Sequence, residues 1–337
     1  MLIALGVAVF LLLPALLLLE VARCACLEWR RDRVPILLYH RLISRAAAGA
    51  GTVRDDEPIY AIHDDTFAAQ MRYLKEDGHT TLSLDQFLAM RRGERPLPPK
   101  ALVITFDDGY ESNYTLALPA LRRFGHRATV FVALEPDEYT RRQVEGIDRF
   151  LTADQMRELD AAGVAIESHT VTHCVLSELD DDAVRLELTE SKRRLGEILG
   201  RPVRHLAIPR SGQSRRVRSL ARAAGYETIC GNSKGSSNGW SNLLSLPRIV
   251  IERDMTADDF ARALTPKAAL VLRLVGNLKR LPAILFGAGF ATRLRRLLYF
   301  GPLGRLFVTR RLKRLLAGAV ALYLLGSILF AWYLVTR

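Results

Sequence analysis

Two short stretches carry residue types that could perform hydrolytic chemistry together. The stretch VITFDDGY ends an apolar run with the adjacent carboxylates of Asp107 and Asp108, and further along the chain AIESHTVTHC places His169 and His173 four residues apart. Two imidazoles and one carboxylate, with coordination positions left for water and substrate, form a hydrolytic metal site. The second carboxylate is then available as a base for the metal-bound water. An Asp pair alone is usually a turn and a His pair alone is often exposed, so the prediction rests on their joint occurrence.

The elements that would position these residues form an alternating pattern of strands and helices. Continuous apolar runs rich in β-branched residues are typical of buried strands, and amphipathic stretches that end at a glycine are typical of helices. The predicted strands are VPILLYH (34–40), ALVITF (101–106), ATVFVAL (128–134), GVAIES (163–168) and HLAI (205–208). The predicted helices cover 66–77, 113–124, 153–162, 181–199 and 215–224, ending at Gly78, Gly125, Gly163, Gly200 and Gly225. This alternation predicts an α/β fold whose parallel sheet closes as a barrel, with its chemistry on loops after the carboxyl ends of strands.

The two motifs resemble those of a known family. TFDDG (105–109) and SHTVTH (168–173) are similar to the first motif and the metal-binding motif of the NodB-type polysaccharide deacetylases, carbohydrate esterase family 4, and the resemblance extends over about 34–262. It implies a distorted (β/α)7 barrel that hydrolyses the N-acyl group, acetyl or formyl, of an amino sugar. By the same resemblance Asp107 is the catalytic base. A divalent metal, usually Zn2+ although the ligand types admit Co2+, Ni2+ or Mn2+, is bound by Asp108, His169 and His173.

Two further motifs of the family are altered in this chain. The third motif usually reads R-x-P-[FY]-G, whereas the corresponding stretch is AIPRSG, with Ala207 at the arginine position. We therefore expect Arg210 to supply the charge near the base and its N–H to stabilise the oxyanion, and Pro209 to contact the substrate. The fifth motif, L-x-H, normally provides the acid that protonates the departing amine. The corresponding stretch, SLPRIVI, contains no histidine.

Three residues outside these motifs complete the predicted site. His40, in ILLYHRL, is expected to be the general acid, because the chain resembles exopolysaccharide deacetylases in which the histidine of an N-terminal Tyr-His motif enters the active site. Simple packing at a strand end is the alternative for His40. Arg248 follows Pro247 near the expected mouth of the barrel and is predicted to contact substrate. Trp240 is predicted to stack on a sugar ring, with packing inside its own loop as the alternative.

Two apolar runs mark the ends of the chain. Residues 2–19 and 316–335 are uncharged, and each run is long enough to span a bilayer as a helix. A cleaved signal peptide is disfavoured for the first run, because no Lys or Arg precedes it and no A-x-A-like site follows it. The predicted order is a transmembrane helix or uncleaved signal anchor (1–20), a catalytic domain (34–265), a basic amphipathic membrane-surface segment (266–315) and a second transmembrane helix (316–335).

The charge of the chain is concentrated near its C-terminal end. The formal net charge is +12, and from Pro266 onward there are thirteen Lys or Arg residues and no Asp or Glu. Because these cations are interleaved with Leu and Phe beside an apolar run, they favour anionic membrane lipids over nucleic acid as the partner. Cations also lie on the inner side of each run: Arg23, Arg30, Arg31 and Arg33 after the first, and Arg310, Arg311, Lys313 and Arg314 before the last. This asymmetry predicts a cytoplasmic catalytic domain, with the periplasmic side as the alternative.

A cytoplasmic enzyme held at the membrane would suit a lipid-linked amino sugar or glycolipid as substrate. The first alternative is the same reaction on an exported polysaccharide, either poly-N-acetylglucosamine-like or peptidoglycan. The second is an inactive, membrane-tethered carbohydrate-binding protein whose catalytic site has decayed. Stoichiometric metal would separate an enzyme from such a protein.

Overall fold

The computed structural model describes residues 12–46, 60–142 and 144–278 of the chain. The chain divides into two compact units, Glu28–Ala269 on the one hand and Met1–Leu27 with Leu270–Arg337 on the other. The predicted C-terminal span, most of the basic segment and the first part of the N-terminal run lie outside the described residues. Helix α2 (Leu13–Glu28) has 16 residues. Within the described ranges, no helix combines the length and apolarity needed to cross a bilayer.

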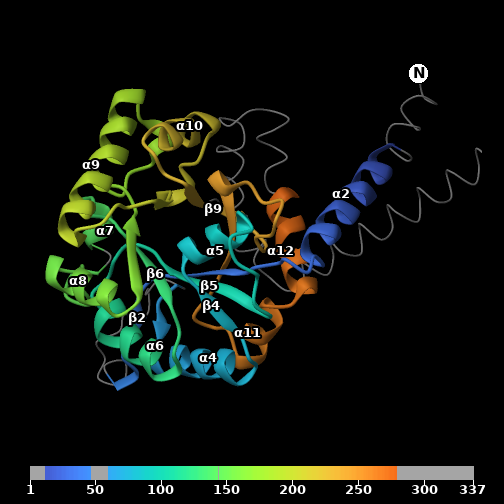
Figure 1. Cartoon of the computed structure of the whole chain (residues 1–337), viewed down its shortest axis with the longest axis horizontal. Coiled ribbons are helices and arrows are strands. Elements are labelled where there is room, and N and C mark those ends of the chain that lie inside the picture. Colours follow the sequence, from blue (N-terminus) through green and yellow to red (C-terminus); the bar gives the residue numbers. More distant parts are fainter. Residues whose placement is uncertain (1–11, 47–59, 143, 279–337) are drawn as a thin grey trace, which may run out of the picture. The chain divides into compact units, whose positions relative to one another are not determined.

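One parallel sheet closes on itself and forms the frame of the unit Glu28–Ala269 (Figure 1). Its strand order is β1-β10-β9-β8-β7-β6-β5-β4, and β1 also pairs with β5. Seven strands therefore form a ring, and β4 extends it beside the first half of β5. The strands are β1 (Ile36–Tyr39), β4 (Thr80–Leu82), β5 (Ala101–Phe106), β6 (Ala128–Val132), β7 (Val164–Ser168), β8 (His205–Ala207), β9 (Thr228–Lys234) and β10 (Leu246–Val250), with a separate pair β2 (Leu42–Ile43) and β3 (Ile62–His63). The predicted parallel seven-strand barrel is confirmed.

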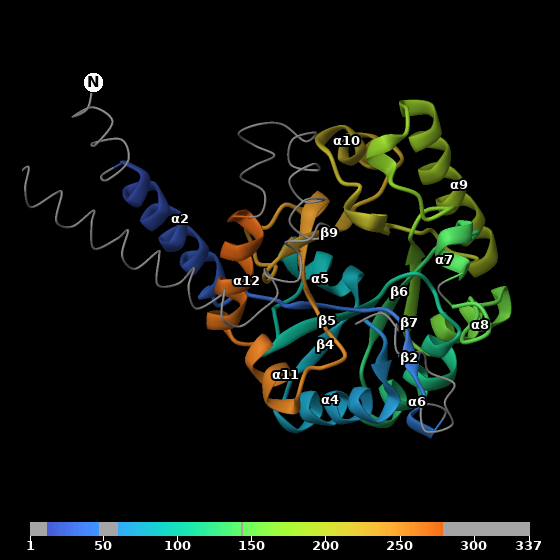
Figure 2. The ribbon, with the colours of Figure 1, turned by 180° about the vertical axis from the view of Figure 1, so that it is seen from behind.

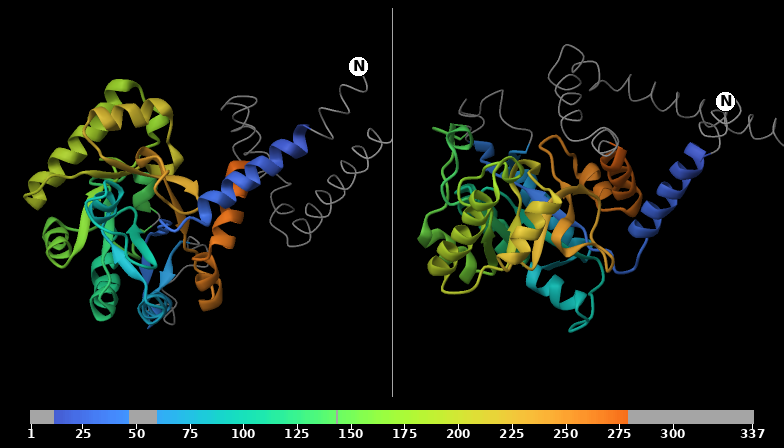
Figure 3. Two further views of the ribbon diagram at one scale, coloured as in Figure 1. Left: turned by 45° about the vertical axis from the view of Figure 1, so that its right-hand side comes forward. Right: turned by 90° about the horizontal axis from the view of Figure 1, so that it is seen from above.

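Apart from α5, which contributes buried side chains to the core, the helices of this unit lie around the outside of the strands (Figures 2 and 3). All five glycines predicted to end helices have a positive φ, from 66° to 85°, which glycine adopts without steric cost. The predicted helix at 113–124 begins as a π-helical turn, η2 (Asn113–Ala117), before α6 (Leu118–Phe124). The other helices are α4 (Asp64–Glu76), α5 (Leu84–Arg91), α7 (Glu138–Arg142), α8 (Ala153–Ala161), α9 (Asp181–Leu199), α10 (Arg215–Ala223), α11 (Ala257–Ala263) and α12 (Pro266–Leu278), with short 3-10 turns η3 (Leu176–Glu178), η4 (Pro209–Ser211) and η5 (Leu243–Ser245).

The interior of the ring is a packed apolar core. Its buried side chains come from strands on opposite sides of the ring and from α5, so they must fill the space that the strands enclose. The cluster consists of Val34, Ile36, Leu82, Leu84, Phe87, Ala101, Val103, Phe131, Ala207, Cys230 and Leu246. A filled interior fixes the strand ends, and the loops that follow the strands are therefore held in defined positions.

Candidate active site

The two motifs meet at the carboxyl ends of neighbouring strands. Asp107 and Asp108 directly follow β5, and His169 directly follows β7. Strand β6 lies between β5 and β7, so the two loops flank one position on the rim of the barrel. Asp108 turns away from the strand with φ +77°. The structure thus brings the predicted carboxylates and imidazoles together, as expected of loops at this end of parallel strands.

Three of these side chains converge on a single point. The Asp108 Oδ1 atom lies 3.3 Å from His169 Nε2 and 3.1 Å from His173 Nε2. One ligand atom from each of the three residues lies within 4.8 Å of the others, and all three residues are buried. Two imidazole nitrogens and one carboxylate oxygen are a donor set that suits Zn2+ and other divalent transition metals, with room for water or substrate.

The far nitrogens of both imidazoles are held by hydrogen bonds. His169 Nδ1 donates to the backbone carbonyl of Ala207 at 2.7 Å. His173 Nδ1 lies 2.9 Å from Thr140 Oγ1, and because that hydroxyl donates to Asp137 Oδ1 at 2.7 Å, it accepts from His173. Both rings therefore carry their proton on Nδ1 and turn Nε2 towards Asp108. Outer contacts of this kind set the tautomer and orientation of metal-ligating histidines, so the donor set fits a metal.

The loops around the site are strained, and the loop that carries the histidines is braced by α9. Asp108, Thr170, His173 and Arg210 are four of the five non-glycine residues with positive φ in the described part of the chain. Strained residues of this kind persist where the surrounding structure holds them, and they cluster at functional sites. The Glu187 carboxylate of α9 provides that support, accepting from the backbone N–H groups of Val171 at 2.8 Å and Thr172 at 3.0 Å.

Asp107 forms a buried ion pair with Arg248 of β10. The guanidinium donates from both terminal nitrogens to the two carboxylate oxygens, each at 2.7 Å, and the side chains are only 6% and 1% exposed. Burial raises the pKa of Asp107, but the charge and hydrogen bonds of Arg248 outweigh it and lower the pKa below the ordinary value. The second oxygen, Oδ2, lies 4.0 Å from His169 Nε2. The carboxylate is therefore ionised, fixed in its plane and adjacent to the converging triad.

The structure gives the two arginines contacts that differ from those predicted. Arg248 was expected to contact substrate, but it is buried and its guanidinium is occupied by Asp107. Arg210 was expected to supply the charge near the base. Its side chain instead donates to Asp137 and Thr140, both at 2.7 Å, and lies over the Tyr139 ring. Arg210 thus supports the hydrogen-bond chain behind His173, and the role of its backbone N–H at an oxyanion stays a prediction.

His40 lies next to the carboxylate pair. Tyr39 is opposite Phe106 in the ladder between β1 and β5, so His40 and Asp107 leave adjacent strands at the same level. The His40 ring stacks on Tyr60, with centroids 5.0 Å apart. Its buried Nδ1 atom has no hydrogen-bond partner among the described residues. Burial lowers the pKa of His40, against the opposing charges of Asp108 and Asp107.

One residue next to Asp108, His169 and His173 was not predicted from the sequence. Tyr110 is 5% exposed, and its ring stacks on Phe150 with centroids 5.3 Å apart. Burial first, and the charge and hydrogen bond of Asp108 next, raise the pKa of the Tyr110 hydroxyl. A neutral phenol beside Asp108 supplies a further hydrogen-bond donor to the ligand set. The residue stands directly after FDDG, but its type alone gave no reason to assign it.

The two remaining predicted residues lie in different places. Pro209 is buried and begins the 3-10 turn after β8, close in sequence to the carbonyl that orients His169. Trp240 belongs to a loop that pairs, through Ser237, with Val34 at the amino end of β1. Its ring is 66% exposed and lies 3.9 Å from the Arg30 guanidinium carbon. The structure therefore does not bring Trp240 to the site at the carboxyl ends, and the loop-packing alternative describes its surroundings better.

Comparison with known proteins points to one family. Residues 94–229 match the family model for polysaccharide deacetylases. Over 228 residues the chain is 26% identical to a Bacillus subtilis (strain 168) protein whose name is "Putative polysaccharide deacetylase YxkH". The match covers 68% of this chain and 75% of that protein. A 150-residue stretch, 42% of the chain, is 31% identical to the poly-beta-1,6-N-acetyl-D-glucosamine N-deacetylase of Escherichia coli (strain K12), but spans only 21% of that enzyme.

Solved structures show the same fold. The Streptococcus pyogenes deacetylase PplD in complex with acetate is 24% identical, with a TM-score of 0.61 over 70% of this chain and 100% of that one. BC0361, a polysaccharide deacetylase from Bacillus cereus, is 24% identical, with a TM-score of 0.56 over 69% of each chain. Together the comparisons support a polysaccharide deacetylase domain on a barrel of the NodB type. Homologues in this family are carbohydrate N-deacetylase hydrolases and are generally metal-dependent.

Proposed function

Starting from a polysaccharide deacetylase domain, we propose that this protein catalyses metal-dependent hydrolysis of the N-acetyl group of an amino sugar. The observation that carries the proposal is the ionised, Arg248-clamped carboxylate of Asp107 directly beside the convergent Asp108, His169 and His173. A base with a fixed direction next to a ligand set with room for water is the arrangement that hydrolysis of an amide requires.

Each residue of the site has a separate proposed role. Asp108, His169 and His173 would hold the metal, for which we propose Zn2+. When bound, such an ion polarises a carbonyl oxygen and lowers the pKa of a coordinated water. Asp107 accepts the proton of the attacking water, and the two-point contact with Arg248 keeps its carboxylate in one plane throughout.

His40 is the proposed proton donor to the departing amine. An amine leaves readily only when it is protonated, so the reaction needs an acid on the leaving-group side. His40 comes from β1, on the opposite side of β5 from β6 and β7, and its buried Nδ1 has no protein partner among the described residues. The side chain as a whole is only partly buried, so its exposed part is available to a substrate atom. Tyr60, stacked on the ring, would keep the imidazole in place.

The substrate is proposed to be a lipid-linked amino sugar or glycolipid, modified on the cytoplasmic side of a membrane to which the chain is anchored. This part rests on the apolar runs 2–19 and 316–335 and on the cations that flank them. An exported polysaccharide is the second candidate, favoured by the similarity to the Escherichia coli poly-beta-1,6-N-acetyl-D-glucosamine N-deacetylase.

Acetate release from two substrates tests the proposal. The full-length protein, purified in neutral detergent and supplied with zinc, receives a polyprenyl-phosphate N-acetylamino sugar or a soluble N-acetylglucosamine oligomer. Asp107→Asn serves as the control for each substrate. We expect release from the lipid-linked sugar that is abolished in the variant. Release from the oligomer alone would move the assignment to an exported polymer. Stoichiometric zinc without release from either would refute the reaction, and absence of zinc would indicate a decayed site.

A further inference from the structure

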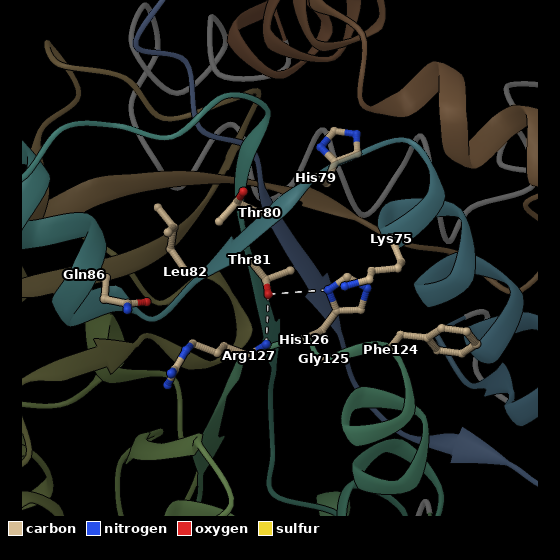
Figure 4. Close-up of a pocket in the computed structure, with 10 residues that line it drawn as sticks. All are labelled: Lys75, His79, Thr80, Thr81, Leu82, Gln86, Phe124, Gly125, His126 and Arg127. Carbon is tan, nitrogen blue, oxygen red and sulfur yellow. Dashed lines mark hydrogen bonds between the residues drawn. The ribbon is translucent and has the colours of Figure 1, made fainter.

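A second hollow with its own chemistry lies at the other end of the barrel strands. It encloses about 300 Å³ and is lined in part by Lys75, His79, Thr81, His126 and Arg127 (Figure 4). Thr81 lies in β4, and Arg127 directly precedes β6. The hollow therefore opens near the amino ends of strands, whereas the proposed active site follows their carboxyl ends.

The cations of this hollow lack carboxylate partners. No Asp or Glu lines it. Among the described residues, neither the Lys75 ammonium nor the Arg127 guanidinium makes a hydrogen bond or an ion pair to protein. Other cations at these strand ends are neutralised: Lys100 pairs with Asp77 at 2.8 Å, and Arg201 pairs with Asp160 and Glu167. Lys75 and Arg127, both exposed, thus line one small cavity without a carboxylate partner among the described residues.

The remaining polar groups of the hollow are already committed. His126 Nε2 donates to the carbonyl of Met71 at 2.8 Å, so its Nδ1 is an acceptor and faces the Thr81 hydroxyl at 3.5 Å. The same hydroxyl accepts from the backbone N–H of Arg127 at 2.9 Å. His79 donates from Nδ1 to the carbonyl of Lys100, and its Nε2 lies 3.2 Å from Asp77. The imidazoles form a fixed wall, and the side chains of Lys75 and Arg127 are free to bind a ligand.

The cationic surface continues beyond this hollow. An adjoining one of about 450 Å³ shares His126 and Arg127, adds Arg122, and is also lined by no acidic residue. The Arg127 guanidinium reaches towards it, because a Cβ atom on Gly163 would lie 3.6 Å from Arg127 Nη1. Arg127 therefore stands between two cavities whose charged groups are all positive.

We propose that this basic hollow binds a phosphoryl group, either as free phosphate or as the phosphate of a lipid headgroup. A planar guanidinium and a flexible ammonium that line one cavity can both donate hydrogen bonds to the tetrahedral oxygens of a phosphoryl group. The cavity volume lies at the lower end of the range for small-ligand sites, which suits a compact anion better than a nucleic-acid strand. The site is separate from the proposed deacetylase centre and adds an anion-dependent contact at the opposite face.

Titration with two probes tests the proposal on the full-length protein in neutral detergent at fixed ionic strength. One probe is inorganic phosphate, and the other is short-chain phosphatidic acid below its micelle concentration, each followed by calorimetry. The test variant is Lys75→Gln with Arg127→Gln. The control is Arg72→Gln, which removes one positive charge from an exposed position on α4 that does not line the hollow, and the single variants Lys75→Gln and Arg127→Gln are compared with it. Thermal unfolding confirms that each variant is folded.

We expect one equivalent of phosphate or phosphatidic acid to bind, with affinity at least tenfold weaker in the double variant and unchanged in Arg72→Gln. Preference for the lipid would assign the site to a membrane headgroup, and preference for the inorganic ion would assign it to free phosphate. Equal binding by wild type and double variant, equal losses in the double variant and Arg72→Gln, or no binding of either probe would overturn the proposal.

Discussion

At the residue scale, the site depends on side chains that are held by defined contacts. The pair of Asp107 and Arg248 is the clearest case, because the two charges contact each other at two points and both side chains are buried. Removing one member of such a pair leaves a buried charge that costs about 3–5 kcal/mol of stability. Keeping the charge while changing its geometry should separate the catalytic role of the pair from its structural role.

Arg248→Lys makes that separation. A lysine retains the positive charge, but a single ammonium cannot hold both carboxylate oxygens of Asp107. We expect kcat/KM for acetate release to fall about 10–100-fold, the range associated with small misplacement of a reacting group. Zinc content and the unfolding midpoint should change little. Arg123→Lys on α6, an exposed position, serves as the control. Full activity of Arg248→Lys would show that the direction of the base is set by other groups.

The contact behind His173 leads to a prediction about metal affinity. Thr140 accepts from His173 Nδ1 and donates to Asp137, so a valine there removes the acceptor while keeping the shape of the side chain. We expect Thr140→Val to bind zinc about 10–100-fold more weakly in competition with a chelator. Thr189→Val changes a threonine on the exposed face of α9 and should leave the zinc affinity at its original value. Unchanged affinity in Thr140→Val would exclude a tautomer-setting role for the hydroxyl.

At the element scale, the loops after the strands are placed by unusual backbone conformations. The turn after β5 needs both Asp108 at φ +77° and Gly109 at φ +81°. A Cβ atom on Gly109 would approach Val132 Cγ1 at 3.0 Å, closer than side chains normally pack. The chain can therefore reverse tightly against β6 only with glycine at this position, and that reversal places the two carboxylates.

Two glycines with similar φ separate these effects. Gly78, with φ +74°, has open space where its Cβ would lie. Gly78→Ala should cost about 1–2 kcal/mol, the expense of a left-handed conformation alone. Gly109→Ala should cost more, because the contact with Val132 adds to it, and should also reduce zinc binding by moving Asp108. Denaturant unfolding and zinc titration of both variants provide the comparison. Equal losses of stability with intact zinc binding would mean that the turn tolerates a side chain.

The same elements show which parts of the fold can be predicted from short sequence patterns. The strands leading to Asp107 and His169 are continuous apolar runs, so their ends and the residues that follow could be predicted from short windows of sequence. Strand β4 has only three residues, and β10 contains Pro247 and a buried arginine. Short sequence patterns of this kind are typical of a turn or an exposed segment, so neither strand was predicted. The pairing of Arg248 with Asp107 joins residues 141 positions apart. It depends on β10 lying beside β1, which no local pattern encodes.

At the scale of the whole molecule, closure of the sheet gives the barrel two ends with different chemistry. The pairing of β1 with β5 brings His40 beside Asp107, although 67 positions separate them in the chain. The carboxyl ends then carry a negatively charged, metal-competent centre, and the amino ends carry the basic hollow around Lys75 and Arg127. In barrels of this kind the amino-terminal face usually serves stability. Lys75 and Arg127 are exposed and have no carboxylate partner among the described residues, so the cavity that they line is open to an anion.

The metal-competent centre should connect function to global stability, because its ligands come from loops after two different strands. A ligand that binds only the folded state stabilises it by about 2.7 kcal/mol at a free concentration 100 times its Kd. For a unit of this size that corresponds to a shift of about 5–10 °C in the unfolding midpoint. We expect removal of zinc by a chelator to lower the midpoint of the wild type by this amount, and readdition to restore it. Asp108→Asn should unfold near the chelated wild type and respond little to zinc. A wild-type midpoint insensitive to the chelator, or an Asp108→Asn variant that responds as the wild type does, would contradict metal binding by the three converging side chains.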